Sequence, residues 1–483
     1  MTRTWSVLLS AAVALACTAT LATSASASSF TRGFADDVYI ATYNNSQTPR
    51  EWARRIYAAG GRVAEVEVDW SSYEPKAPTG NTYPTSPANP VYMNWPFLDT
   101  VVETLKAAGV QPLFLVTDAP GWAQANGGRN REIQGDEPND RALRGFMQAL
   151  ATRYDGSYPS PSGHGRHLPR VRYYQAWAEA NLNIKLAPQW TRSNGAWQNS
   201  GAVLYRQLLN AFYTGVKAAA PSDKVVFSGL ESYGNPPGGP RTPPVTFLEN
   251  VLCLNASLVK QPCSDPAHFD VMAADPYEQW SPTTSALSPT DASAPDLGRL
   301  MKVINAAIKA NTVVPDAHKP LWVTEFGYDS NPPNPNGLPV AEQAAWLEDS
   351  FYVFWKEGVS TDLWYLIRDQ PGKLWNVNYY SGIYLYNGKR KKSYTAYQFP
   401  LVVAADGTQA QIWGMAPTSG VVHVQTRVNG QWSTIASYHA SAGSVFESLI
   451  AAPEKGALFR AVVGPSTSLT WRYNVSASQP DPF

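Results

Sequence analysis

The stretch RVAEVEVDW, residues 62–70, is typical of a β-strand, because it is rich in valine and contains no Gly or Pro. An amphipathic helical pattern follows over 95–108 and stops at Gly109, and a second apolar strand pattern covers 111–116. Strand, helix and strand in this order predict a parallel βαβ unit.

The same alternation of strands and helices continues to about residue 400. Helical patterns cover 141–154, 204–219, 297–310 and 341–357, and strand patterns cover 172–177, 225–229, 269–273, 321–323 and 362–366. About eight such units over this length predict an α/β fold, a (β/α)8 TIM barrel over 29–400. We expect the functional side chains at the C-terminal ends of the strands, under the Pro- and Gly-rich loop 236–244 and the segment before 204.

The pattern changes after residue 400. Helical periodicity gives way to short alternating runs at 409–414, 421–425, 432–436 and 457–463, separated by turn residues. This predicts a small antiparallel β-sandwich over 401–476. Residues 477–483 are polar and rich in proline, so we expect a frayed tail.

The first 28 residues have the features of a secretory signal peptide. Arg3 gives a positive start, an apolar run extends to about residue 22, and the small residues 24–28 offer a cleavage site near Ala27 or Ser28. A lipoprotein site at Cys17 is the alternative, although Ala14 departs from that motif. No later apolar run is long enough to cross a bilayer, so we expect a secreted, extracellular protein without a membrane partner.

Cleavage of the signal would leave two cysteines, Cys253 and Cys263. An even pair in an exported chain predicts one disulfide that closes a loop. The six histidines show no ligand spacing and no Cys or His cluster accompanies the pair, so we expect no metal. No Gly-rich phosphate loop follows a strand, so we expect no nucleotide cofactor.

Charge and aromatic content narrow the possible partners. The 38 basic residues balance the 38 acidic ones, whereas a nucleic-acid binder normally has a basic excess. The only dense basic run, 389–392, is expected to be a solvated loop. The 17 Trp and 25 Tyr residues supply flat apolar faces of the kind that stack on sugar rings, although many will be core residues.

Two glutamates follow apolar strand patterns. Glu179 ends the run YYQAWAEAN, residues 173–181, and Glu325 lies within PLWVTEFG, residues 320–327. A carboxylate at the end of a buried strand is costly unless it is paired or takes part in chemistry. Two of them on separate strands of one barrel are what the cleavage of a glycosidic bond requires. The alternative is that each is a buried glutamate paired with Arg or Tyr.

On these residues the barrel segment resembles retaining glycoside hydrolases of the clan that contains families 5 and 39. It is similar in particular to the family 39-like type found among proteins secreted by actinobacteria. The main matches are Trp177, Glu179 and Asn181 at the fourth strand, and 322–327 at the seventh. Supporting matches are Asp69, Trp70, 119–123, Pro276, Tyr277, Trp364, Arg368 and Asp369.

The resemblance implies hydrolysis by double displacement. Glu325 would attack the anomeric carbon, while Glu179 would protonate the leaving oxygen and later deprotonate water. The two carboxyl groups should then lie about 5–5.5 Å apart, the spacing of retaining enzymes. The implied substrate is a plant or microbial polysaccharide, or an oligosaccharide derived from one, and we expect the protein to be a monomer.

Several further residues are candidates for substrate binding. Trp364 would form a floor for the sugar or pack the barrel, Tyr277 would hold Glu325 or belong to the core, and Asn181 would bind sugar or brace a loop. The complete candidate set is Trp70, Trp122, Asn181, Asp275, Tyr277, Trp364 and Glu65. Trp190, Trp280 and Trp375 are further candidates for outer sugar contacts, with packing as the alternative.

The chain departs from the family pattern at three positions. Ala178 replaces the Asn that binds the sugar 2-hydroxyl, Glu65 replaces an Arg that holds the nucleophile, and Asp275 replaces a His. Asp275 and Glu65 could bind a cationic or hydroxyl-rich group or a metal, or could face away from the site. The substitutions indicate either a rebuilt sugar subsite or a catalytically weak or inactive carbohydrate-binding protein on a glycosidase scaffold.

Overall fold

The computed structural model describes residues 30–36, 49–80, 82–161, 163, 165–277, 280–372 and 378–474. The predicted signal peptide, residues 1–28, the tail at 477–483 and Trp375 lie outside these ranges. No helix within them is long and apolar enough to span a membrane.

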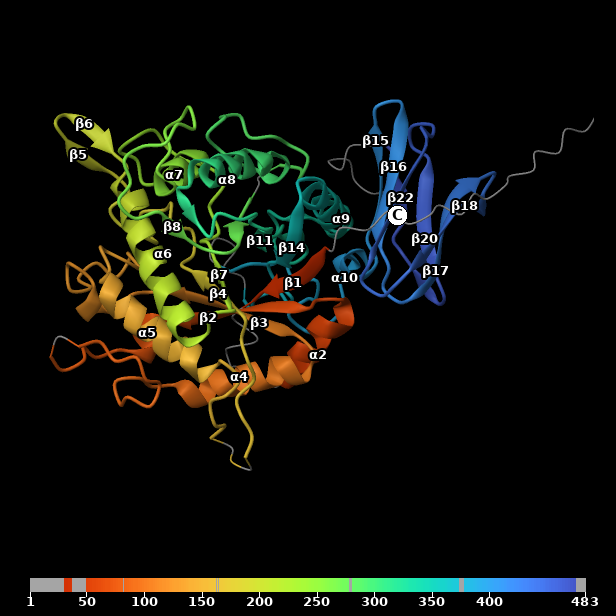
Figure 1. Ribbon diagram of the computed structural model, residues 1–483. Coiled ribbons are helices and arrows are strands. Elements are labelled where there is room, and N and C mark those ends of the chain that lie inside the picture. The colour runs from red at the N-terminus through yellow and green to blue at the C-terminus, as the bar shows by residue number, and fades with distance from the viewer. Residues whose placement is uncertain are drawn as a thin grey trace, which may run out of the picture.

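Eight parallel strands form the centre of the larger part of the molecule (Figure 1). A parallel bridge between Val226 and Val271 joins the two ends of the sheet, so the strands close into a ring. This confirms the predicted TIM barrel. Around the sheet the strands are β7 (Lys224–Val226), β4 (Tyr173–Ala176), β3 (Gln111–Thr117), β2 (Val63–Asp69), β1 (Thr31–Ala35), β14 (Val359–Trp364), β11 (Leu321–Phe326) and β9 (Met272–Ala274).

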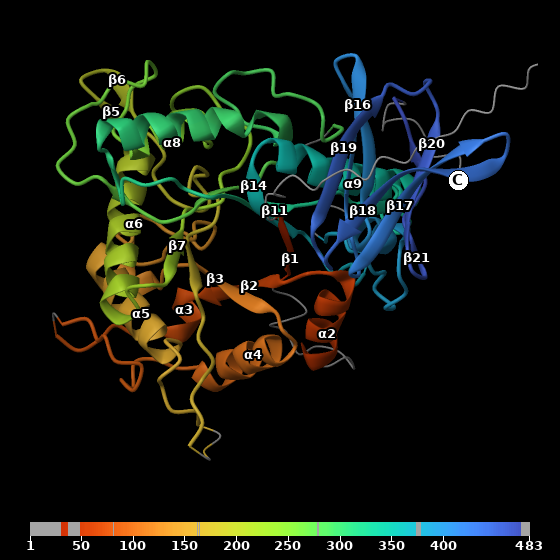
Figure 2. The same cartoon turned by 45° about the vertical axis from the view of Figure 1, so that its right-hand side comes forward.

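The helices lie outside this ring, as Figures 1 and 2 show. In α8 the buried residues are Leu300, Val303, Ile304 and Ala307, a spacing that places them on the face turned toward the strands. The helices are α2 (Pro49–Ala59), α3 (Trp70–Tyr73), α4 (Trp95–Ala107), α5 (Asp140–Arg153), α6 (Ser200–Ala219), α7 (Pro244–Val251), α8 (Gly298–Ala310), α9 (Val340–Lys356) and α10 (Lys392–Gln398), with 3-10 turns η1 (Gly121–Ala123) and η2 (Ala294–Asp296).

Short pairs of strands lie in the loops between these elements. A hairpin precedes α6, one parallel pair connects the loop after α7 with the segment after α8, and another lies between β11 and α9. The pairs are β5 (Thr191–Ser193) with β6 (Ala196–Gln198), β8 (Ala267–His268) with β10 (Val313–Val314), and β12 (Ser330–Asn331) with β13 (Leu338–Pro339).

A cluster of apolar side chains fills part of the barrel interior, which is therefore a packed core rather than a pore. Its members are Ala35, Val63, Leu113, Val226, Val271, Ala273, Trp322 and Leu363. Because side chains alternate along a strand, Glu65 and Glu67 face the same way as Val63, toward the barrel interior.

Strand β1 carries little of the expected strand pattern, since Arg32 and Gly33 interrupt its apolar residues. A Cβ at Gly33 would collide with the side chain of Leu363 and the carbonyl of Val63. Glycine is therefore required where β1 passes between its two neighbours.

The C-terminal part is a β-sandwich of two antiparallel sheets over a core of its own. One sheet has the order β15 (Leu401–Asp406), β16 (Gln409–Met415) and β19 (Val445–Ala451). The other contains β18 (Gln431–Ala440), β17 (Gly420–Val428), β20 (Leu458–Val463), β21 (Ser466–Thr467) and β22 (Trp471–Arg472). This confirms the predicted sandwich.

The sandwich lies beside α9 and α10 in Figure 1. Trp413 of β16 is fully buried and meets the ring of Phe30 edge-on, with centroids 6.3 Å apart. The hydroxyl of Tyr352 on α9 donates to Gln411 Oε1 at 3.0 Å. Trp413 therefore belongs to the same apolar cluster as the barrel helices.

The basic run 389–392 is only partly a solvated loop. Lys391 is buried, and its Nζ lies 2.6 Å from Asp369 Oδ1 and also donates to Ser330 Oγ at 2.8 Å. The expectation of a solvated loop is wrong for this lysine, because the buried carboxylate of Asp369 needs a cation.

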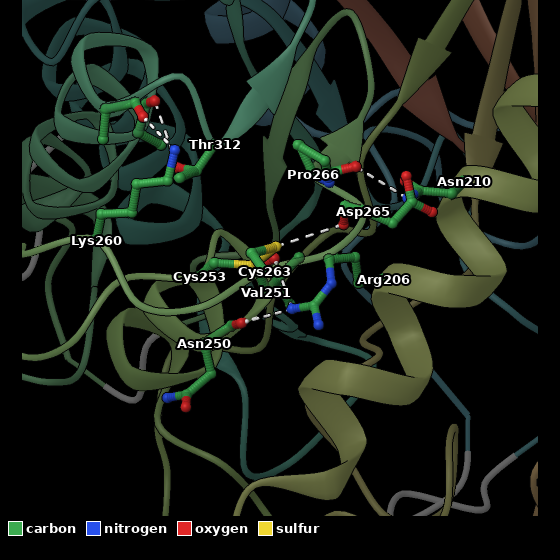
Figure 3. The surroundings of a disulfide bond; sticks show 12 residues. Arg206, Asn210, Asn250, Val251, Cys253, Lys260, Cys263, Asp265, Pro266 and Thr312 are labelled. Atoms are coloured by element: carbon green, nitrogen blue, oxygen red, sulfur yellow. Dashed lines mark hydrogen bonds between the residues drawn. A yellow bond between two sulfur atoms is a disulfide. The ribbon is translucent and has the colours of Figure 1, made fainter.

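Cys253 and Cys263 form the predicted disulfide (Figure 3). The segments on either side of the loop that they close contact α6. The guanidinium of Arg206 donates to the carbonyl of Asn250 at 3.0 Å. Asn210, one turn further along α6, donates from Nδ2 to the carbonyl of Pro266 at 2.9 Å. The disulfide thus joins two segments that lie against one outer helix of the barrel.

We expect the double variant Cys253→Ser with Cys263→Ser to unfold at a lower temperature. The cysteines are ten positions apart, and opening a loop of this size costs about 2–3 kcal/mol of stability in the chain-entropy model. Differential scanning calorimetry of the variant and of wild type, with and without reductant, measures the loss. A variant that melts with the oxidised wild type would contradict this role.

Candidate active site

The chain leaves β4 through a strained turn that carries Glu179. Trp177 and Glu179 both have positive φ, 74° and 40°, a region that residues other than glycine rarely adopt. The backbone N–H of Glu179 donates to the carbonyl of Gly229 at 2.9 Å, and the indole N–H of Trp177 donates to the carbonyl of Lys185 at 2.8 Å. These bonds hold the turn, and with it the direction of the Glu179 carboxyl group.

Glu325 lies near the end of β11, where the register against β14 shifts between Val323 and Phe326. The hydroxyl of Tyr277 donates to Glu325 Oε1 at 2.7 Å. The preceding Thr324 points into the barrel, since its hydroxyl donates to Asp275 Oδ1 at 2.7 Å. The register shift therefore allows the consecutive side chains of Thr324 and Glu325 to face the same cavity.

The carboxyl groups of Glu179 and Glu325 influence one another. Burial raises the pKa of Glu325 to about 7, and the charge of Glu179 is the next largest cause. Burial also raises the pKa of Glu179 to about 7, followed by the charge of Glu231. The ammonium of Lys185 lowers the pKa of both carboxyls, and the Tyr277 hydroxyl lowers that of Glu325.

Glu231 is a third carboxyl group of this cluster, which the sequence analysis missed. It shares a side-chain hydrogen bond with Glu179 that raises the pKa of Glu179 and lowers that of Glu231. Burial is the largest cause of the shift of Glu231, whose pKa is also raised above the ordinary value. Arg241 Nη1, 3.9 Å from Glu231 Oε1, favours the ionised form of Glu231.

Asn181 braces the loops that carry these glutamates. Its Nδ2 donates to the carbonyls of Glu231 and Thr242 at 3.1 and 3.0 Å, and its Oδ1 accepts from the N–H of Glu231 at 3.1 Å. Its side chain is fully buried. Of the two roles considered for Asn181, these bonds support loop bracing rather than sugar contact.

Asp275 lies in the barrel interior, within electrostatic range of Glu325 and Glu179. It is 1% exposed, and a Cβ at Gly229 would collide with its carboxyl group. Burial, and then the charges of Glu325 and Glu179, raise its pKa well above the ordinary value. Asp275 is therefore placed to support Thr324 and the floor of the cavity.

More acidic side chains line the β2 and β3 side of the barrel. Glu65 and Glu67 face the interior, and burial raises the pKa of Asp118 to about 6 against a 2.5 Å hydrogen bond from Thr117. Among the described residues no group of three or more His, Cys, Asp or Glu side chains could hold a metal ion. The metal alternative for Asp275 and Glu65 therefore has no support in this arrangement.

Two of the tryptophans proposed as sugar contacts are core residues. Trp70 and Trp364 are fully buried, and their indole N–H groups donate to Glu74 Oε2 and to the carbonyl of Ser381, each at 2.8 Å. Trp122 is half-buried and donates to the carbonyl of Glu74 at 2.9 Å. Trp364 therefore packs the barrel, which was the alternative to a sugar contact. Trp70 is likewise a core residue.

Two residues near the carboxyl pair had no sequence signal. Lys185 lies in an irregular loop after β4, and Tyr379 lies in the segment after β14. The pKa of Tyr379 is raised by burial and then by the charges of Glu325 and Glu179, so its hydroxyl lies within electrostatic range of both carboxyl groups. Glu231, by contrast, follows a predicted strand closely and could have been found there.

The site can be compared with known proteins. No family model matches the chain, and no curated protein does. A family 39 glycoside hydrolase from Bacteroides cellulosilyticus WH2 has 16% identity, with 83% of this chain and 78% of that chain covered and a TM-score of 0.49. A glucosidase from Croceicoccus marinus has 14% identity, coverage of 88% and 93%, and a TM-score of 0.48.

Fungal β-1,4-galactanases are a third example, with 15% identity, coverage of 76% and 98%, and a TM-score of 0.44. These three likenesses are thus to proteins named as a glycoside hydrolase, a glucosidase and galactanases. At these identities the likeness concerns the fold alone.

We expect Glu325→Gln to raise the melting temperature by a few degrees at pH 8 but not at pH 5. The folded-state pKa of Glu325, about 7, exceeds the ordinary value of 4.5, so wild-type stability falls as the pH rises through 7. Glutamine does not ionise and still accepts the Tyr277 hydrogen bond. Thermal melts at both pH values test this, with the exposed sandwich variant Glu454→Gln as control; an equal shift at both would refute it.

Proposed function

We propose that this protein is a secreted retaining glycoside hydrolase in which Glu179 is the acid/base and Glu325 the nucleophile. The observation that carries the proposal is the pair of buried carboxyl groups after β4 and near the end of β11, of which Glu325 accepts a hydrogen bond from Tyr277 and Glu179 interacts with Glu231. The substrate is a plant or microbial polysaccharide, or an oligosaccharide from one. The disulfide supports export, since such bonds persist in oxidising compartments.

The partners favour opposite protonation states in the pair. Tyr277 donates to Glu325 and favours its ionised form, whereas the charge of Glu231 and its hydrogen bond with Glu179 favour the protonated form of Glu179. A nucleophile must be ionised and a general acid protonated at the start of the reaction. These interactions support the proposed roles of the two glutamates.

In the first step the Glu325 carboxylate forms a bond to the anomeric carbon while the bond from that carbon to the leaving oxygen breaks. Glu179 transfers its proton to the leaving oxygen. In the second step Glu179 takes a proton from water, whose oxygen replaces Glu325 at the anomeric carbon. The proposal retains the expected carboxyl separation of about 5–5.5 Å.

A catalytically weak or inactive carbohydrate-binding protein is the second candidate. Ala178 has no side-chain donor for a sugar 2-hydroxyl, and Glu65 places an acidic group in the interior where the family pattern has Arg. Both features reduce transition-state stabilisation relative to that pattern. A covalent trapping experiment separates the two candidates.

Wild-type protein should be labelled by a 2-fluoro glycoside with a good leaving group, and peptide mass spectrometry should place the label on Glu325. Glu325→Ala should lose labelling and at least 1,000-fold in kcat, because no other group can form the ester. Glu179→Ala should still be labelled and should recover turnover with azide. Saturable sugar binding without labelling or turnover would select the binding protein instead.

The anomer released first tests the stereochemistry. Proton NMR of a fresh digest should show the same anomeric configuration as the substrate, because two displacements retain it. Release of the opposite anomer would refute Glu325 as nucleophile and leave it as a general base.

Two conservative variants should move opposite limbs of the pH–rate profile. Glu231→Gln removes the charge and hydrogen bond that raise the pKa of Glu179, so the alkaline limb moves to lower pH. Tyr277→Phe removes the bond that lowers the pKa of Glu325, so the acidic limb moves to higher pH. Profiles of kcat/KM measure both shifts, and Glu249→Gln on α7 is the control for loss of a buried carboxyl. Unmoved limbs would exclude these positioning roles.

A further inference from the structure

A separate cavity of about 640 Å³ opens beside the carboxyl cluster. Two loops form its walls, the one after β7 and the one after β9. Its lining includes Tyr233, Arg241, Trp280, Thr284, Leu287 and Asp291. The cavity is large enough for a sugar unit, and the hydrolytic steps described above do not use its residues.

The cavity is connected to the acid/base through Glu231. Arg241 lines the cavity and lies 3.9 Å from Glu231 Oε1, and the backbone of Tyr233 forms a hydrogen bond with the same carboxylate. Glu231 in turn shares a side-chain hydrogen bond with Glu179. The cavity therefore lies on the Glu179 side of the catalytic pair, where the leaving group of a glycoside must be.

Trp280 gives this cavity an open aromatic face. The residue is 66% exposed, whereas Trp70 and Trp364 are fully buried. Its carbonyl accepts a hydrogen bond from the hydroxyl of Tyr328 at 3.0 Å, which ties the loop to the segment that follows β11. Leu287, also fully exposed, adds apolar surface to the same cavity.

The charges of the cavity balance one another. The guanidinium of Arg241 interacts with both Glu231 and Asp291, so neither an anionic nor a cationic ligand would find an uncompensated partner. Thr284, Ser285 and Ser288 supply neutral polar groups on the opposite wall. An exposed indole with neutral polar groups is suited to the apolar face and hydroxyls of a neutral sugar.

We propose that this cavity is the subsite for the leaving-group part of the substrate, where a neutral sugar unit packs against Trp280 while Glu179 protonates its glycosidic oxygen. The inference rests on the proposed function. The same subsite would accept a sugar in place of water in the second step. The acceptor hydroxyl oxygen then bonds to the anomeric carbon, the bond to Glu325 breaks, and Glu179 takes the hydroxyl proton.

The test compares two substrates that share a glycone. The disaccharides and glycosyl fluorides of glucose, xylose, galactose and mannose are assayed with wild type, Trp280→Ala and Trp280→Phe; Trp432→Ala, on the sandwich, is the matched control. Fluoride is too small to reach the cavity. Trp280→Ala should therefore lose about tenfold in kcat/KM on the disaccharide and keep its rate on the fluoride, because one stacking contact is worth about 1.4 kcal/mol.

Trp280→Phe should recover most of the lost rate, and Trp280→Ala should lose transfer of the glycosyl group from the fluoride to added disaccharide. A Trp280→Ala protein with the fluoride rate of wild type is correctly folded at the catalytic pair. Equal losses on both substrates, or no loss on either, would overturn the subsite.

A binding measurement keeps the inference separate from the proposed function. If wild type hydrolysed neither substrate class, the proposed function would fall. Titration of tryptophan fluorescence with the four disaccharides would then test whether the cavity binds saccharides. A saturable change in fluorescence that requires Trp280 supports a saccharide site. A wild-type protein that shows no such change would refute the cavity assignment as well.

Discussion

The rest of the site depends on the mutual repulsion of three buried carboxyl groups. Burial raises the pKa of Glu179, Glu231 and Glu325, and the charge of each disfavours the ionisation of another. The cations and donors around them act in the opposite direction. Arg241 lowers the pKa of Glu231, Tyr277 lowers that of Glu325, and Lys185 lowers those of Glu179 and Glu325.

The backbone that carries these carboxyl groups is locally strained. Trp177 and Glu179 adopt positive φ, and Gly229 must lack a side chain because Asp275 occupies the adjacent space. Such conformations persist only where surrounding bonds over-determine them. Here the backbone bond from Glu179 to Gly229 and the amide of Asn181 provide that support, so the loops after β4 and β7 act as one unit.

The sequence was informative where a local pattern had a unique structural meaning. Alternating strand and helix patterns predicted the barrel, and an acidic residue at a strand end marked Glu179 and Glu325. The sequence patterns did not predict the direction in which individual side chains point. Trp70 and Trp364 matched a motif, but their indole N–H groups donate to Glu74, four residues further on, and to the carbonyl of Ser381, in the segment after β14.

Other features were missed for similar reasons. Strand β1 has a glycine because Leu363 and Val63 crowd it, and Lys391 is buried because Asp369 is. Both are consequences of contacts between segments far apart in the chain. Glu231 is different, since it follows the predicted strand 225–229 by two residues and was overlooked only because it belongs to no motif.

The position of Trp413 has a consequence for how the chain can be divided. Its ring contacts Phe30 at the start of β1 and lies about as close to Tyr352 and Trp355 on α9. A truncation that ends the polypeptide at the last barrel helix would uncover this aromatic surface and the first strand together. β16 of the C-terminal sheets therefore shares one apolar cluster with the barrel, and a division of the chain at residue 400 would cut through that shared core.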